Sequence, residues 1–383
     1  MRADYLPVLG CSSSKCTANS SNPSKPARER DLYLFVLYAP LPSERKSGAL
    51  ARRQNPIGAI LTRTEQIVTA VLPCLQQDFP RARLLLRSLI SYKNPLKKLI
   101  IACPSRQIDW FERNIHEFRN QLDIKLVDES ILVPELNECW WVRGWVKQQL
   151  LKLAVAEVIE TNFYLTLDAD VVLRRDVDFA DLILENKARY AFLHPTPHMS
   201  WYRGSWRVLG MKFKRSQMEH NVTPTVLSVC AVKKLARFLE KRAQQIQESK
   251  GPKNFIQRSI LNSKEKSFPH GTKSWTLLLA AFALWPISEW TEYSLYYSFL
   301  EEHQLLTNYH IETDEVFYDK EQSIHKKHAD KFDKIDWKAV FQQTSPHEDC
   351  AKRPPFIIVQ SVSKVPLEKI VGTFSNFLQE PGQ

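Results

Sequence analysis

The stretch Phe163-Tyr164-Leu165-Thr166-Leu167-Asp168-Ala169-Asp170-Val171-Val172-Leu173 places two aspartates between two apolar runs. The first run, residues 163–167, has the length and composition of a buried central strand in an α/β sheet. Side chains two apart in an extended chain point to the same side, so Asp168 and Asp170 should present their carboxylates together where that strand ends. The carboxyl ends of strands are the ligand-binding edge of open α/β sheets. The stretch therefore predicts a ligand site at the end of a central strand.

Two carboxylates on one side suit a hard divalent cation. Mg²⁺ and Mn²⁺ prefer oxygen ligands, and one or two carboxylates usually hold them together with substrate phosphates. A second pair with the same spacing, Asp176 and Asp178, follows two arginines and has no apolar strand before it. We interpret Asp178 as the cap of a helical segment at residues 179–184. Asp168 and Asp170 are thus the predicted metal ligands, and the alternative is a polar turn that closes a buried strand.

Strands and helices alternate in the residues before this stretch. Residues 66–75, 98–102 and 123–127 have the pattern of strands, and residues 81–92 and 109–120 that of helices. This β-α-β-α-β order is the first half of a doubly wound nucleotide-binding sheet. The chain has only 10 glycines and contains neither a GxGxxG nor a Walker A loop, which disfavours phosphate binding on glycine-rich backbone. A fold that holds phosphates through a metal fits better.

The loop after the first strand, residues 73–80, is expected to contact the base or ribose of a nucleotide. Asp78 is the candidate hydrogen-bond acceptor there, because an ionised carboxylate only accepts. The other interpretation is that Asp78 caps the helix that begins near Pro80. The sequence leaves both interpretations open, and one residue could serve both purposes.

The apolar strand, the Asp168-Ala169-Asp170 triplet and the amphipathic helix before them resemble the DxD region of GT-A-fold glycosyltransferases. The chain also resembles a bacterial family of uncharacterised GT-A-like proteins over residues 66–375, through Gly144-Trp145-Val146-Lys147-Gln148-Gln149-Leu150-Leu151-Lys152-Leu153 and Thr291-Glu292-Tyr293-Ser294-Leu295-Tyr296. The resemblance implies a Rossmann-like mixed α/β sheet flanked by helices. It also implies that Asp168 and Asp170 hold Mn²⁺ or Mg²⁺ against the diphosphate of a nucleoside-diphosphate sugar, with Asp168 contacting the donor as well.

The resemblance assigns roles to four further residues. GT-A enzymes often place polar or cationic side chains of the helix before the DxD strand against the donor, which implies donor contacts for Gln149 and Lys152. An acidic residue on the acceptor side implies Glu292 as the catalytic base or as a residue that positions the acceptor. A late histidine often completes the metal site, which implies one of His310, His325 and His328; we select His325, although the sequence does not distinguish them. The simpler interpretations are a solvated lysine with a buried stem for Lys152 and a helix-stabilising glutamate for Glu292.

The second half of the chain is expected to carry the acceptor side. The segment 199–213 is rich in Trp, Tyr and Arg and is predicted to be a loop that lines the acceptor, because aromatic faces with arginine suit stacking on sugars or bases. The segment 248–273 is polar and is also predicted to be a loop. The remaining predicted elements are strands at 189–193, 226–232 and 356–359 and helices at 145–159, 235–247, 274–284, 292–305 and 366–378.

The N-terminal residues differ in composition from the rest of the chain. The stretch 11–26 is rich in Ser, Asn, Lys and Pro, which indicates disorder. Residues 1–64 are therefore predicted to be a disordered or poorly ordered extension. Residues 65–380 are then expected to form one GT-A-like domain, with a nucleotide-sugar-binding half at 65–195 and an acceptor-side half at 196–380.

Composition and charge limit the class of protein. With 44% hydrophobic and 25% charged residues the chain can build a sizeable core, and its longest apolar run, residues 277–284, is too short to span a membrane. Seven cysteines without zinc or CxxC spacing favour a reducing compartment, so we expect a cytoplasmic protein. The net charge of +11 favours phosphorylated substrates and a peripheral contact with the anionic inner face of the membrane. Nucleic acid is disfavoured because no recognised aromatic-basic module occurs.

The sequence thus predicts a metal-dependent, hexosyltransferase-like glycosyltransferase. It would move a sugar from a nucleoside-diphosphate sugar to a hydroxyl of a glycan, lipid or polysaccharide precursor. Two alternatives stay open. A nucleotidyltransferase on a similar sheet would normally show a glycine-rich basic loop after the first strand, and residues 72–80 contain no glycine. A basic binding protein without enzymatic activity would keep the fold without the chemistry.

Overall fold

The computed structural model describes residues 67–193, 199–212, 219–220, 223–284, 290–314, 317–325, 329–342 and 353–378. The chain divides into two units, Met1–Ile60 and Leu61–Gln383. All of the described residues belong to the second unit. The predicted disordered extension, residues 1–64, lies outside the described residues.

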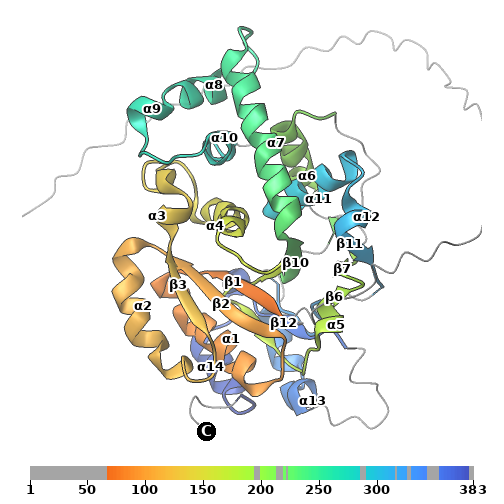
Figure 1. Cartoon of the computed structure of the whole chain (residues 1–383). Coiled ribbons are helices and arrows are strands. Elements are labelled where there is room, and N and C mark those ends of the chain that lie inside the picture. Colours follow the sequence, from red (N-terminus) through yellow and green to blue (C-terminus); the bar gives the residue numbers. More distant parts are fainter. Residues whose placement is uncertain are drawn as a thin grey trace, which may run out of the picture. The chain divides into compact units, whose positions relative to one another are not determined.

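A five-stranded sheet forms the centre of the second unit, in the order β10-β4-β1-β2-β3 (Figure 1). Strands β1, β2, β3 and β4 run parallel to one another, whereas β10 is antiparallel to β4. The predicted mixed α/β sheet is therefore confirmed, and the strand that precedes Asp168 is a central one. The strands are β1 (Val68–Pro73), β2 (Leu96–Cys103), β3 (Ile124–Asp128), β4 (Phe163–Thr166) and β10 (Thr225–Ser228).

Apolar side chains on both faces of these strands explain why both faces are covered. In β1, Val71 packs into one core cluster, whereas Ala70 and Leu72 pack into another. The same alternation separates Ile100 from Ile101 in β2. Because side chains alternate with period two along a strand, a strand that is apolar throughout is buried on both sides.

Helices supply the two covers (Figure 1). The face that contains Ala70 and Leu72 packs against α1 (Phe79–Ser91) and α2 (Ile108–Ile115). The face that contains Val71 packs against four helices, α4 (Gly144–Ala154), α7 (Val229–Glu248), α10 (Ser274–Phe282) and α11 (Glu292–Glu302). No described helix is long and apolar enough to cross a membrane.

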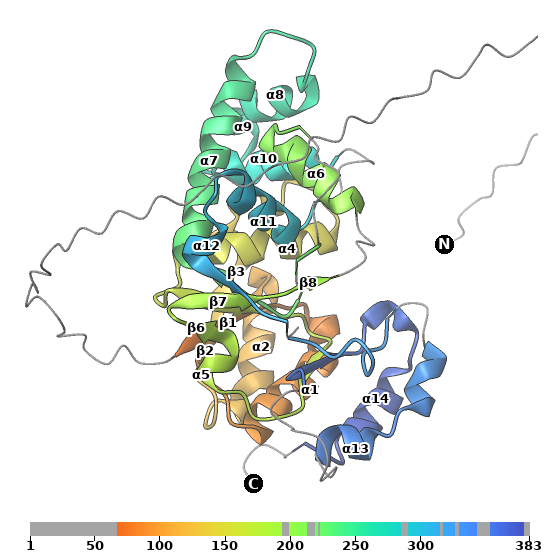
Figure 2. The same ribbon diagram turned by 90° about the vertical axis from the view of Figure 1, so that its right-hand side faces the viewer.

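The C-terminal part of the chain returns to the central strands. Strand β12 (Phe356–Ile358) pairs antiparallel with β5 (Val171–Leu173), which directly follows Asp170. Helices α13 (Trp337–Gln342) and α14 (Leu367–Phe374) pack beneath this pair and against α1, in a third core cluster (Figure 2). This pairing brings the residues that follow β12 beside Asp170.

Small sheets and short helices complete the unit. The further strands are β6 (Ile183–Leu184), β7 (Lys187–Tyr190) and β11 (His310–Glu312), which form one sheet, and β8 (Phe192–Leu193) and β9 (Glu219–His220), which form another. The further helices are α3 (Glu129–Leu132), α5 (Phe179–Leu182), α6 (Met199–Leu209), α8 (Phe255–Asn262), α9 (Lys264–Ser267) and α12 (Leu306–Tyr309). Asp178 caps α5 in a capping box with Asp181, as predicted.

Three segments differ from their predicted conformation. The segment predicted as an aromatic loop forms α6, because Tyr202, Trp206 and Leu209 share one buried helical face. The strand predicted at 226–232 ends at Ser228, whose side chain accepts the Ala231 N–H and starts α7. The loop predicted at 248–273 contains helices α8 and α9.

Candidate active site

A cavity of about 410 Å³ lies where the Asp168-Ala169-Asp170 triplet leaves the sheet, and we call it the DAD cavity. Its walls come from the loop after β1, from α4, from the start of α11 and from the chain after β12. All the candidate residues from the sequence line it, namely Asp78, Gln149, Lys152, Asp168, Asp170, Glu292 and His325. The structure thus brings together residues that are up to 247 positions apart (325 minus 78).

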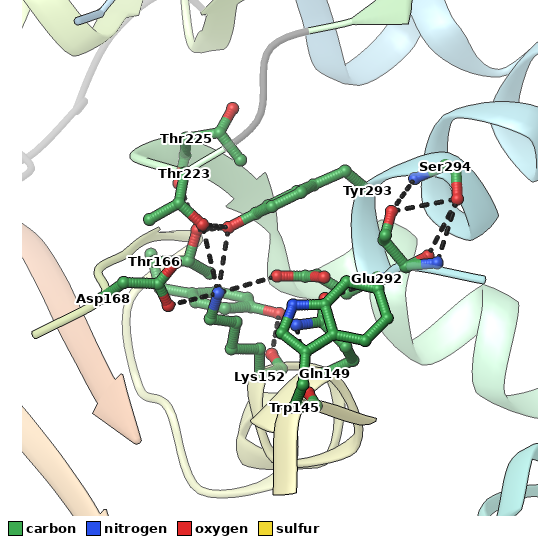
Figure 3. Close-up of polar contacts among 12 residues, drawn as sticks. Trp145, Gln149, Lys152, Thr166, Asp168, Thr223, Thr225, Glu292, Tyr293 and Ser294 are labelled. Carbon is green, nitrogen blue, oxygen red and sulfur yellow. Dashed lines mark hydrogen bonds and ion pairs between the residues drawn. The ribbon is translucent and has the colours of Figure 1, made fainter. Parts of the chain in front are cut away.

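The ammonium group of Lys152 is the centre of the polar cluster in this cavity (Figure 3). Its Nζ lies 2.7 Å from Oδ1 of Asp168 and 2.9 Å from Oε1 of Glu292. It also donates to the hydroxyls of Thr223 at 3.1 Å and of Tyr293 at 3.3 Å. An ammonium has three protons, so these four oxygens share all of them.

Because Lys152 and Glu292 are buried, their opposite charges attract each other strongly, and either charge without its partner would destabilise the folded protein. The side chains of Lys152 and Glu292 are 1% and 0% exposed, whereas that of Asp168 is 35% exposed. Burial lowers the pKa of Lys152, but the carboxylates of Asp168 and Glu292 outweigh it and hold this pKa well above its usual value. Burial raises the pKa of Glu292 against the opposing effect of Lys152. The interpretation of Lys152 as a solvated lysine is therefore wrong.

Helix spacing and a helix cap place these groups. Lys152 and Gln149 lie on the side of α4 that lines the DAD cavity. The amide of Gln149 donates to the carbonyl of Trp145 at 3.3 Å and accepts the N–H of Glu292 at 3.4 Å. Thr291 caps α11 in a capping box, so Glu292 stands in the first turn, where the helix dipole favours a negative charge.

Three residues that the sequence analysis did not select complete the polar cluster around Lys152, namely Thr166, Thr223 and Tyr293. The hydroxyl of Tyr293 lies 2.9 Å from Oγ1 of Thr166, the last residue of β4, and also contacts Oγ1 of Thr223. Burial, followed by the charge of Glu292, raises the pKa of Tyr293 well above its usual value, so it stays a neutral phenol. No spacing in the sequence points to Thr223, because it reaches the cluster only through the tertiary structure.

The two aspartates form a set of oxygens that fits a hard cation. Oδ2 of Asp170 accepts the N–H of Ser361 at 3.0 Å, which links it to the chain after β12. Burial and the neighbouring charge of Asp168 raise the pKa of Asp170 to about 6. A divalent cation between the two carboxylates would relieve this repulsion.

Among the described residues, no third protein ligand joins the two aspartates. Within the described part of the chain, no three His, Cys, Asp or Glu side chains gather closely enough to hold a metal. His325 lines the same cavity, and its ring centroid lies 6.2 Å from that of Tyr318. A cation at Asp168 and Asp170 would take further ligands from phosphate and water, as Mg²⁺ often does, and the role of His325 as a ligand stays a prediction.

Asp78 faces the DAD cavity without capping α1. It occupies the N-cap position, but its side chain makes no capping hydrogen bond, so the capping interpretation is wrong. Burial raises the pKa of Asp78, and the charge of Arg81 opposes this effect. Its predicted contact with a base or ribose stays a prediction.

A second cavity, of about 520 Å³, lies at the carboxyl ends of β1, β2 and β3. Its walls include residues 73–75 after β1, Ser105 and Arg106 after β2, and Glu129 after β3. Gln148 of α4 lines both this cavity and the DAD cavity, so α4 forms the wall between them. Of the walls of this second cavity, the sequence predicted only the loop after β1 as part of a ligand site.

Comparisons with known proteins give a family and a set of distant structural likenesses. No curated protein matches the sequence. Mouse xyloside xylosyltransferase 1 is 12% identical, with 78% of this chain and 99% of that chain covered and a TM-score of 0.40. The glycosyltransferase GlyE of Streptococcus pneumoniae TIGR4 is 10% identical, with 83% and 66% covered and a TM-score of 0.36. The galactosyltransferase LgtC, solved with donor and acceptor sugar analogs, is 8% identical, with 82% and 98% covered and a TM-score of 0.35.

The assignment of the fold to the α/β class follows from the strand order of the central sheet. The family comparison is of a different kind, because it covers most of the sequence. Residues 65–381 match the model of a family described as a family of unknown function, DUF6492. The chain belongs to this family.

Proposed function

We propose that this protein is a metal-dependent glycosyltransferase, which moves a sugar from a nucleoside-diphosphate sugar to a hydroxyl of an acceptor. One observation carries the proposal. Asp168 and Asp170 leave a central strand of a largely parallel sheet and line one cavity at its carboxyl edge. This is the position where an α/β sheet binds ligands, and two carboxylates there suit a cation that carries phosphates.

Asp168 and Asp170 would hold Mn²⁺ or Mg²⁺. When bound, the cation supplies Lewis-acid stabilisation of the diphosphate that leaves. Lys152 adds positive charge beside it, although its protons are shared among four protein oxygens. We therefore propose that Lys152 acts mainly by holding the Asp168 carboxylate in place.

The donor would extend across both cavities. The diphosphate would lie in the DAD cavity and the nucleoside in the second cavity, where residues 73–75 form one wall. Asp78, the residue predicted to contact a base or ribose, lines the DAD cavity instead, so in this arrangement it would lie nearer the phosphates. Arg106 and Lys147, against the single acidic residue Glu129, give the second cavity a net positive lining that suits a phosphorylated ligand. Gln148 lines both cavities and marks the passage between them.

Glu292 is the candidate for the base that takes the acceptor proton. Its Oε1 is paired with Lys152, whereas its Oε2 has no hydrogen-bond partner within the described residues. Its raised pKa makes the carboxylate a better proton acceptor than an exposed glutamate, in line with what general base catalysis needs. Oε2 is buried in this structure, so an acceptor hydroxyl would have to displace a neighbouring side chain to reach it and pass its proton to the carboxylate.

Metal-dependent donor binding tests the proposal. The melting temperature is measured with UDP-, GDP-, CDP- and ADP-sugars, each with and without Mn²⁺. We expect one base to stabilise the protein in a Mn²⁺-dependent way. Asp168→Asn/Asp170→Asn should abolish this effect. The second pair with the same spacing is the matched control: Asp176→Asn/Asp178→Asn should keep it, because asparagine still caps α5.

If no donor stabilises the protein in the presence of the metal, the transferase proposal is wrong. A binding protein without enzymatic activity would then be the better explanation. If a nucleoside triphosphate stabilises it and no sugar donor does, a nucleotidyltransferase is favoured.

A further inference from the structure

Two tryptophans form one wall of the DAD cavity. Trp145 lies in the first turn of α4 and Trp201 in the first turn of α6. Their ring centroids are 5.8 Å apart and their planes are inclined by 37°. The side chain of Trp145 is 41% exposed and borders this polar cavity. An exposed large apolar side chain beside a cavity calls for an explanation, since burying it elsewhere would stabilise the fold.

The distance between the rings decides how they could bind a ligand. A ring between two others needs about 7 Å between their centroids, twice the contact distance of about 3.5 Å between carbon atoms. The two tryptophans are closer than this, so they form one apolar wall. A ligand would lie against the outer surface of the wall, on the side of the cavity.

The position of Trp201 is fixed relative to the polar cluster. Its carbonyl accepts a hydrogen bond from the Ser294 hydroxyl at 3.3 Å, and this hydroxyl lies 2.7 Å from that of Ser205 in α6. Trp206 of α6 also donates to Ser298 of α11 at 3.0 Å. These contacts join α6 to the helix that begins with Glu292, so the wall is preorganised beside the candidate base.

The surroundings of the wall suit a sugar ring. A pyranose has an apolar C–H face, which stacks on the negative face of an aromatic ring, and a polar rim, which needs hydrogen-bond partners. Gln148, Asp78 and Ser361 line the cavity with such partners. A lipid chain would need a continuous apolar lining, and Asp168, Asp170 and Arg81 line the same cavity.

We infer that Trp145 and Trp201 bind a sugar ring of the acceptor, so that the acceptor is a saccharide. This inference rests on the proposed transferase function of the DAD cavity. The acceptor is favoured over the donor base because the second cavity, beyond α4, offers the nucleoside a site at the strand ends. Trp201 also comes from the half of the chain that follows β4, as do Thr223 and Glu292.

Saturation-transfer NMR tests the inference without the donor or the metal. The probes are the methyl α- and β-glycosides of glucose, galactose, mannose, xylose and N-acetylglucosamine, with lactose and cellobiose. We expect saturation transfer to at least one probe, and at least tenfold weaker binding of that probe by Trp145→Ala and Trp201→Ala. Trp145→Phe should keep part of the affinity. Trp140→Ala is the matched control, because Trp140 is 85% exposed and lines neither cavity.

The Mn²⁺-dependent donor shift in melting temperature is measured for the same variants, which also shows that each of them folds. We expect this shift to be unchanged. If Trp145→Ala loses the donor shift and keeps sugar binding, the wall holds the nucleobase and the acceptor assignment is overturned. If no probe binds to the wild type, a saccharide acceptor is excluded, while the donor shift still decides on the transferase independently.

Discussion

The Nζ of Lys152 lies 2.7 Å from Oδ1 of Asp168, and this contact joins helix α4 to the end of strand β4. The same ammonium lies 2.9 Å from Glu292 at the start of α11. One buried cation therefore sets the relative positions of the candidate metal ligand and the candidate base. It links α4 and β4, which are close in the sequence, to α11, which is distant from both.

Lys152→Met should destabilise the protein by about 3–5 kcal/mol, because it leaves the buried Glu292 carboxylate without its partner. Glu292→Gln alone should cost less, since Asp168 still pairs with the ammonium. The double variant Lys152→Met/Glu292→Gln should be more stable than the sum of the two single losses predicts. Urea unfolding measures the stability of all three variants.

Lys125→Met, at an exposed position of β3, is the control and should change stability by no more than about 0.5 kcal/mol. Additive effects would contradict the coupling.

Tyr293→Phe should cost about 1–3 kcal/mol of stability, because it removes a buried hydroxyl that contacts Thr166, Thr223 and Lys152. The Mn²⁺-dependent donor shift should persist, since Tyr293 is not among the proposed metal ligands. Tyr92→Phe is the matched control. It removes one hydrogen bond of 3.3 Å to the carbonyl of Phe341 and should cost less. Equal losses in the two variants would show that the Tyr293 hydroxyl has no special role.

Arg106→Ala should weaken the binding of a free nucleoside diphosphate about tenfold, which corresponds to about 1.4 kcal/mol. The reason is that Arg106 lines the second cavity, where we place the nucleoside, and its charge attracts the diphosphate in the adjoining DAD cavity. Calorimetric titration with and without Mn²⁺ measures the affinity. Arg113→Ala, on the exposed side of α2, is the control. Unchanged affinity in Arg106→Ala would move the nucleoside out of this cavity.

His310 should make the stability depend on pH below about 6.5. It is buried and its Nε2 lies 2.8 Å from the hydroxyl of Tyr296. Burial, with the charge of His220, lowers the pKa of His310 to about 3. Between about pH 6.5 and 3 the unfolded chain binds a proton that the folded chain does not, so the free energy of unfolding falls as the pH falls. The limiting slope for one group is about 1.4 kcal/mol per pH unit.

His310→Gln should reduce this slope, because glutamine keeps a polar side chain at the position but does not titrate. Urea unfolding at pH 7, 6 and 5 gives the slopes. His116→Gln, at an exposed position, controls for the loss of an imidazole. The same slope in His310→Gln and in the wild type would show that another group is responsible.

The secondary structure could be predicted where local pattern decides it. Continuous apolar runs define β1, β2 and β4. The aspartates that follow β4 lie at its carboxyl edge because a strand fixes the direction in which the chain leaves it. The aromatic segment of α6 was wrongly predicted as a loop. The i, i+4, i+7 spacing of Tyr202, Trp206 and Leu209 is present in the sequence, but the polar partners that fix the helix, Ser294 and Ser298 of α11, are brought to it only by the tertiary structure.

For the candidate site, sequence alone determined the carboxylate pair and its place at the end of a central strand, and the family resemblance supplied Gln149, Lys152, Glu292 and His325. Tertiary structure alone decided that Lys152 is buried between Asp168 and Glu292, that Thr223 joins them, and that Ser361 holds Asp170. Periodicity reports only which side of its own element a side chain occupies. Which side chains from other elements meet it depends on how those elements pack, and this is also what determines the burial and the charge of the Lys152 cluster.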